Sequence, residues 1–115
     1  MPTPEGRVVA AVKAAVKAAG GEVRKCEWVN RIGAPDLFVM VNGRHGWVEC
    51  KAPGEEPRGS QWREFFRMEA KGGCAVLIVD SVEAAMQVPR ALSDAVEAGG
   101  GVYMVSTMPS GEGHA

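Results

Sequence analysis

Residues 33–51, GAPDLFVMVNGRHGWVECK, are the stretch of sequence that decides the fold. Two runs rich in β-branched and aromatic residues flank an Asn-Gly pair, which is among the most reliable short-range signals of a β-hairpin. With a four-residue loop at 42–45, the ladder sets Asp36 opposite Lys51. Directly opposed residues share a face of a sheet, and side chains alternate along each strand. We therefore expect Asp36, Glu49 and Lys51 to project from the same side.

The rest of the chain alternates between helical and strand signals. Thr3 followed by a proline is a typical helix start, and Ser60 is placed to cap a later helix. Asp80 with Glu83 has the spacing of a capping box. The continuous apolar run at 74–79 indicates a strand covered on both faces. The expected elements are a helix from Pro4 to the Gly20-Gly21 pair, strands at 22–29, 37–41 and 46–51, a helix at 61–71, a strand at 74–79, helical structure from about 81 to 98 that breaks or kinks at Pro89, and an edge strand at 102–105.

Length and composition indicate a small globular protein. The chain has 115 residues, of which 46% are hydrophobic and 23% charged, and we expect one domain over residues 1–105 with a flexible tail at 106–115. It contains no long apolar run and no signal peptide, so we expect a cytoplasmic protein without a membrane segment. Three cysteines without metal-ligand spacing are expected to be reduced and mostly buried.

The formal net charge is −1, which argues against a protein that coats nucleic acid through bulk electrostatics. It does not exclude a nuclease. Carboxylates that hold a divalent cation lower the formal count, and the cation restores positive charge where a phosphate binds.

The chemistry expected of Asp36, Glu49 and Lys51 follows from their side chains. Mg²⁺ prefers hard oxygen ligands and commonly uses one or two carboxylates together with water and substrate phosphate. Gly33 and Pro35 place Asp36 at the mouth of its strand, where a ligand can reach it. The alternative is a structural ion-pair cluster, in which the lysine balances the carboxylates.

Glu5 also bears on this choice. On a helical projection it falls within the apolar arc formed by Val8, Val12 and Val16, so we expect its carboxylate to point inward. It is either a first-turn partner for the helix dipole or a ligand of the site. Three inward carboxylates against one lysine would be costly without a cation, and this favours the metal site.

Two other kinds of site find little support. His45 lies in a turn and His114 in the tail, so no zinc ligand set is present. Cys50 points away from the face that carries Glu49 and Lys51, and neither histidine is placed to activate it as a nucleophile.

Taken in order, these motifs resemble those of the VRR-NUC domain, a branch of the PD-(D/E)XK nuclease superfamily found in phages, bacteria and eukaryotic repair enzymes. The resemblance covers roughly residues 5–85 and implies an αβββαβ restriction-endonuclease-like core, an α/β fold in which helices flank a mixed sheet. The element order given above agrees with that core. The motifs that carry the resemblance are Glu5, Gly33-Ala34-Pro35-Asp36-Leu37, Glu49-Cys50-Lys51, Ser60-Gln61, and Gly72-Gly73 before an apolar strand.

The resemblance implies roles for individual residues. Asp36 and Glu49 look like the metal-binding carboxylates, and the backbone carbonyl of Cys50 is implied as a further ligand. Lys51 looks like the catalytic lysine that positions the attacking water and offsets charge in the transition state. Glu5 matches the first-helix glutamate of the family and is implied as a metal ligand. The implied cofactor is Mg²⁺ or Mn²⁺, with no organic cofactor.

Residues near the following helix are less specific. Gln61 matches a glutamine of the family and either holds water or phosphate near the site or simply caps the helix. Surface arginines and lysines are as a rule only solubilising, and two glutamates in the loop at 53–59 weaken its case as a DNA-facing segment. The candidate phosphate contacts are Lys25, Arg31, Arg58, Arg63 and Arg67.

These observations together predict a metal-dependent nuclease that hydrolyses phosphodiester bonds of DNA, selective for branched or junction structures. By analogy with small phage relatives and junction resolvases, we expect a homodimer. The alternative is a nucleic-acid-binding or interaction module on the same fold without catalytic activity.

Overall fold

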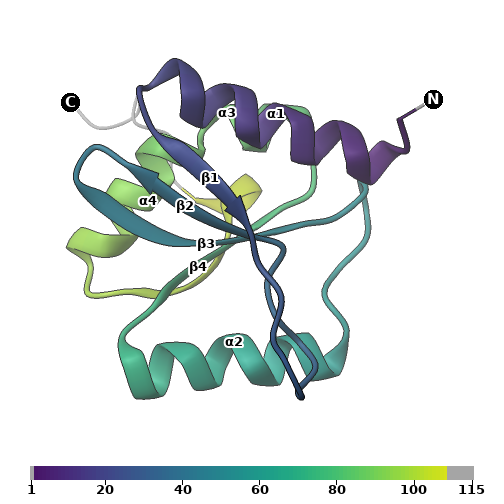
Figure 1. The fold of residues 1–115 in the computed structure, drawn as a ribbon, viewed down its shortest axis with the longest axis vertical. Helices are drawn as coiled ribbons and strands as arrows, with labels where there is room; N and C mark the ends of the chain where they lie inside the picture. Colours follow the sequence, from purple (N-terminus) through teal and green to yellow (C-terminus); the bar gives the residue numbers. More distant parts are fainter. Residues whose placement is uncertain (1, 109–115) are drawn as a thin grey trace.

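The computed structural model describes residues 2–108. It shows an α/β fold with one sheet and helices on both of its faces (Figure 1). The elements, in chain order, are α1 (Pro4–Ala18), β1 (Glu22–Lys25), β2 (Leu37–Val41), β3 (Arg44–Cys50), α2 (Gly59–Gly72), β4 (Ala75–Val79), α3 (Val82–Met86), α4 (Val88–Glu97), β5 (Gly101–Met104) and the 3-10 helix η1 (Val105–Thr107).

The sheet is mixed, as the sequence predicts. Its strand order is β1-β2-β3-β4-β5. The first three strands pair antiparallel, whereas β3 with β4 and β4 with β5 pair parallel. Helices α1, α3 and α4 cover one face, and α2 lies alone on the other (Figure 1). Because α2 connects β3 to the parallel strand β4, it crosses over the sheet and brings its first turn close to the end of β3.

The core lies mainly between the sheet and α1, α3 and α4. In α1 the buried residues are Val8, Val12 and Val16, a spacing of four that places them on one face of the helix. Every residue of β4 is buried, because this strand has neighbours on both sides and helices on both faces. A smaller cluster around Phe65 packs α2 against the opposite face.

The β2–β3 hairpin differs from the prediction in its register. Asn42 and Gly43 alone form the turn, with φ of 55° and 74°, and Val41 pairs with Arg44. The expected four-residue loop was wrong. A two-residue turn with both φ values positive matches the twist of the strands, so β2 and β3 stay paired up to the residues that flank the turn. Continued past β2, the register sets Asp36 opposite Glu49 instead of Lys51. The slip is two residues, so the side chains stay on the predicted face.

Other boundaries also shift. The strand expected at 22–29 ends at Lys25, and the following loop contains Asn30 in the left-handed region at φ 63°. Helix α2 begins at Gly59 with Arg58 as N-cap, two residues earlier than expected from a cap at Ser60.

The later helices follow the same pattern of small differences. Ser81, not Asp80, is the N-cap of α3, and its hydroxyl accepts from the Ala84 N–H at 3.0 Å. The expected break falls at Gln87, and Pro89 lies in the first turn of α4, where no intrahelical N–H is needed. Of the predicted tail, Ser106 and Thr107 belong to η1, and residues 109–115 lie outside the described residues. Within residues 2–108, the helices lack the combination of length and apolar character that crossing a bilayer requires.

Candidate active site

Glu49, Lys51 and Gln61 form a hydrogen-bonded group where the end of β3 meets the first turn of α2. Lys51 Nζ lies 3.0 Å from Glu49 Oε2 and donates to Gln61 Oε1 at 3.0 Å. Gln61 Nε2 in turn donates to Glu49 Oε2 at 2.7 Å. The Glu49 side chain is 1% exposed and that of Lys51 13%. The amide therefore ties a buried carboxylate to a nearly buried ammonium.

Gln61 is fixed from a second side. Its Oε1 also accepts from the backbone N–H of Arg58 at 3.0 Å. Arg58 is the N-cap of α2. One side chain thus caps α2, as one of the two interpretations from the sequence has it, and also bonds Lys51 and Glu49.

Asp36 lies at the same end of the sheet, directly before β2. Its Oδ2 accepts from the backbone N–H of Cys50 at 2.8 Å, and its carbonyl accepts from the N–H of Cys26 at 2.8 Å. The residue is therefore held between the ends of β1 and β3 just before β2 begins. The neighbouring Pro35 is buried, which leaves little freedom to the backbone that carries the carboxylate.

The electrostatics of Glu49 are unusual. Burial, and then the negative charge of Asp36, raise its pKa to about 7, although hydrogen bonds and charge from Lys51 and Gln61 act in the opposite direction. Its second oxygen, Oε1, is buried without a hydrogen-bond partner. A buried carboxylate with one unsatisfied oxygen beside another carboxylate is unfavourable unless a cation or proton joins it.

Cys50 lies on the other face of β3, as predicted. It is fully buried in the core beneath α1, and burial together with the charges of Asp36, Glu49 and Glu5 raises the pKa of its thiol. It is therefore a structural residue and not a nucleophile.

Glu5 departs from the prediction. Its side chain is exposed on the first turn of α1 and does not point into the core, because the helix turns its valines, not its first turn, toward the sheet. Its negative charge is one of the smaller causes that raise the pKa of the Cys50 thiol. Across residues 2–108 no three Asp, Glu, His or Cys side chains are gathered closely enough to hold a metal ion by themselves. The predicted convergence of Glu5 with Asp36 and Glu49 is therefore not formed in this structure.

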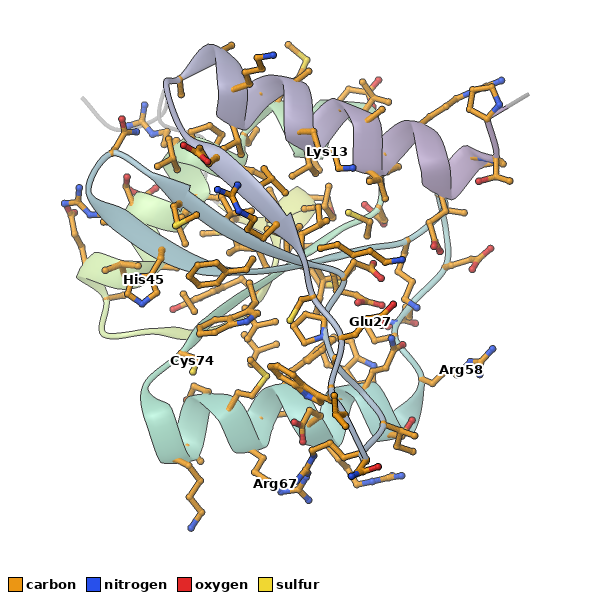
Figure 2. All side chains as sticks on the ribbon, viewed as in Figure 1. Lys13, Glu27, His45, Arg58, Arg67 and Cys74 are labelled. Carbon is orange, nitrogen blue, oxygen red and sulfur yellow. The ribbon has the colours of Figure 1, made fainter. Side chains whose placement is uncertain are left out.

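A cavity of about 600 Å³ opens beside Asp36 between α1 and the loop that follows β1. Lys13, Lys25 and Arg31 are among its lining residues. Lys13, a residue of α1, is labelled in Figure 2. It follows Val9, another lining residue, by one helical turn, and that spacing could have identified it.

The predicted phosphate contacts lie in different surroundings. Lys25 is 3.4 Å from Glu27 in a pair that is mostly exposed, whereas Arg31 and Arg67 both bind the carboxylate of Glu64. Arg58 and Arg63 are exposed at the start of α2. Figure 2 shows Arg58 at the beginning of that helix and Arg67 further along it.

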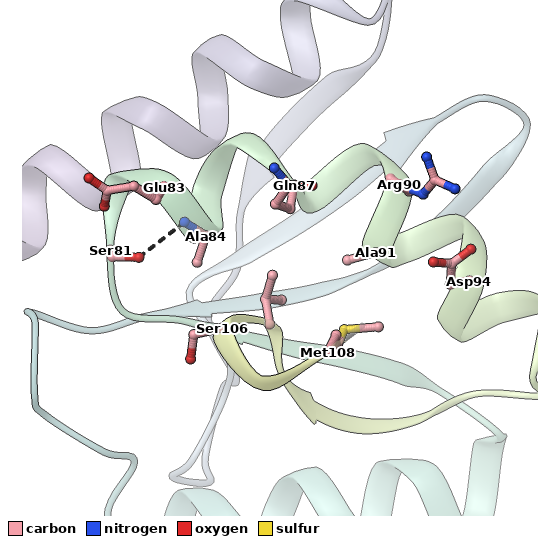
Figure 3. Close-up of a pocket in the computed structure, with 10 residues that line it drawn as sticks. Ser81, Glu83, Ala84, Gln87, Arg90, Ala91, Asp94, Ser106 and Met108 are labelled. Carbon is pink, nitrogen blue, oxygen red and sulfur yellow. Dashed lines mark hydrogen bonds between the residues drawn. The ribbon is translucent and has the colours of Figure 1, made fainter. Parts of the chain in front are cut away.

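A separate cavity of about 320 Å³ lies between α3, α4 and η1 (Figure 3). It shares no lining residue with the cleft beside Asp36, and none of the residues predicted from the motifs lines it. We therefore place the candidate active site where β2 begins and β3 ends, the end of the sheet that carries Asp36 and Glu49.

Comparison with known proteins identifies the family of the chain. No family model matches the chain. A protein of Acyrthosiphon pisum secondary endosymbiont phage 1, named "Putative nuclease p44", is 40% identical over 75 residues, which is 64% of this chain and 80% of that protein. A solved structure described as a VRR_NUC domain superposes with a TM-score of 0.70 at 36% identity, covering 76% of this chain and 96% of the other. On the identity of these relatives and the extent of their coverage, the chain belongs to the VRR-NUC domain family.

Proposed function

We propose that the protein is a nuclease that hydrolyses phosphodiester bonds of DNA and requires Mg²⁺ or Mn²⁺. The observation that carries this proposal is the buried Glu49 carboxylate, whose Oε1 lacks a partner and whose pKa is raised partly by the charge of Asp36. The similarity of this chain to a phage protein named "Putative nuclease p44" supports the same activity.

The residues present fit a hard divalent cation. Glu49 Oε1 and Asp36 supply two carboxylates at one edge of the sheet, the number that Mg²⁺ commonly takes from a protein. The N–H of Cys50 points toward Asp36, and the N–H and C=O of a strand residue face the same neighbouring strand. The Cys50 carbonyl is therefore suitably directed to add a ligand. Exposed Glu5 would act from α1 through its charge. When bound, the cation would neutralise the non-bridging phosphate oxygens and promote attack by water.

Lys51 and Gln61 supply the rest of the chemistry. An ammonium group has three donors. Two of them are directed to Glu49 and Gln61, so the third is available to the phosphate or to the attacking water. Gln61 holds Lys51 in this orientation and keeps Glu49 Oε2 engaged, which leaves Oε1 for the cation.

One experiment tests the proposal directly. The purified protein is incubated with linear, nicked and branched DNA in Mg²⁺ or Mn²⁺, with chelator as a control. We expect cleavage by the wild type and by the matched surface variants Asp94→Asn and Lys71→Ala. Asp36→Asn and Lys51→Ala should lose it. Cleavage that survives both active-site substitutions or ignores chelator would contradict the assignment. DNA binding without cleavage under every condition would support the non-catalytic module instead.

We further propose that two copies act together on branched DNA. A chain of net charge −1 offers few phosphate contacts of its own, and a symmetric pair would double them. Light scattering tests this proposal. A mass equal to one chain for the protein alone, and to one chain plus one DNA molecule when branched DNA is present, at all concentrations would exclude it.

A further inference from the structure

Two arginines bind one buried carboxylate of α2, and a third arginine lines the same cavity. Glu64, whose side chain is 8% exposed, accepts through Oε1 from Arg31 Nη2 at 2.8 Å and from Arg67 Nη1 at 3.0 Å. These residues border a cavity of about 350 Å³. Its lining residues are Arg31, Ile32, Ser60, Arg63, Glu64 and Arg67.

The charges in this cavity are not balanced. Three arginines and a single carboxylate line the cavity, and the side chains of Arg31 and Arg67 remain 52% and 54% exposed. A guanidinium has five N–H donors, and each of these arginines directs one of them to Glu64 Oε1. Glu64 therefore orients Arg31 and Arg67 without neutralising the group, which leaves donors and positive charge for an anion.

The cavity is held at a defined place relative to the active site. Gly33 has φ of 97°, and a Cβ there would lie 2.9 Å from Glu64 Cβ and 3.0 Å from the Ser60 carbonyl oxygen. The loop is thus packed directly against α2. Arg31 lines both this cavity and the cleft beside Asp36, so the two are adjacent. Asp36 follows Arg31 by five positions, a length of chain that spans at most about 18 Å.

We propose that Arg31 and Arg67, oriented by Glu64, bind together with Arg63 a backbone phosphate of the DNA. This phosphate is not the one that is hydrolysed but another on the same strand. Arginine binds phosphate through paired, charge-assisted hydrogen bonds. Nucleotides advance about 3.4 Å each along a strand, so this phosphate lies within about five nucleotides of the cut. The site rests on the proposed nuclease function and gives it a means of placing the strand.

Binding measurements in chelator test the site without cleavage. The fluorescence anisotropy of a labelled nicked duplex is followed for the wild type, Arg63→Gln, Arg67→Gln and the matched control Arg90→Gln, an exposed arginine of α4. Each of the first two variants should bind roughly five- to tenfold more weakly, with the slope of log affinity against log salt reduced by about 0.9. Arg90→Gln should match the wild type. Arg63→Gln and Arg67→Gln variants indistinguishable from Arg90→Gln would overturn the proposal.

Chemical substitution of the DNA locates the phosphate. When single phosphates are replaced by neutral methylphosphonates, one position within about five nucleotides of the cut should weaken binding of the wild type but not weaken Arg67→Gln further. Equal losses in both proteins at every position would contradict the site. In cleavage assays the same variants should raise KM and leave kcat unchanged. Wild-type protein that never cleaves DNA would defeat the proposed function, whereas the chelator experiment decides the phosphate site separately.

Discussion

The raised pKa of Glu49 makes the stability of the cation-free protein depend on pH. In the folded protein the pKa is about 7 against an ordinary value of 4.5, so the native state holds its proton more tightly than the unfolded chain does. As pH rises from about 4.5 to 7, the unfolded state ionises first, and the free energy of unfolding falls. At 1.36 kcal/mol per tenfold change in proton affinity, the total loss is about 3 kcal/mol.

Glu49→Gln should remove this dependence, because the amide resembles the protonated acid and does not titrate. Urea unfolding of the wild type and the variant in chelator, at pH 5 and pH 7.5, measures it. Because the unfolded chain is already largely ionised at pH 5, we expect the wild type to lose about 2.4 kcal/mol more than Glu49→Gln between the two pH values. Parallel pH profiles for the two proteins would refute the reasoning.

The same pair of proteins reports on the cation. At pH 7.5, Mn²⁺ at one hundred times its dissociation constant should stabilise the wild type by about 2.7 kcal/mol. The same concentration should stabilise the wild type less at pH 5, because binding requires the ionised carboxylate. The Glu49→Gln variant should respond far less. Equal stabilisation of both proteins would show that the cation binds elsewhere.

Three further predictions follow from other residues. Gly46→Ala should destabilise the protein by about 1–3 kcal/mol in urea unfolding, because the new Cβ would lie 2.5 Å from Leu92 Cδ1; an unchanged midpoint would contradict the packing. The thiol of Cys50 should react with a thiol-specific reagent only after unfolding, since it is fully buried and its pKa is raised by burial; rapid reaction in the native protein would be inconsistent with this. Gln61→Ala should lower the cleavage rate roughly 10- to 100-fold by releasing Lys51, and a rate equal to that of the wild type would deny Gln61 a positioning role.

The faces of the hairpin were predictable from sequence, although its register was not. The Asn-Gly turn and the alternating pattern fixed which side chains share a face, and a slip of two residues preserves that assignment. Whether the loop has two or four residues depends on how close to the turn the two twisted strands stay paired. The turn sequence alone does not specify this. Asp36 consequently lies opposite Glu49 and bonds the Cys50 N–H.

Other parts of the site depend on tertiary contacts that a linear pattern does not contain. The orientation of Glu5 was wrong because the helical projection does not reveal that the first turn of α1 lies beyond the buried valines. The binding of Arg31 to Glu64, 33 residues later in the chain, requires the loop after β1 to fold back onto α2. Nothing in the sequence around Arg31 or around Glu64 indicates that the two side chains meet.

The dual engagement of Gln61, with the Arg58 N–H on one side and with Lys51 and Glu49 on the other, couples the site to the fraying of a helix end. When the first turn of α2 opens, the same amide is withdrawn from the carboxylate and the ammonium, so local opening and disassembly of the site are one event. Hydrogen exchange at the Arg58 amide thereby becomes a reporter of site assembly. Anything that stabilises the ionised Glu49 should slow that exchange at an amide that does not itself touch the carboxylate.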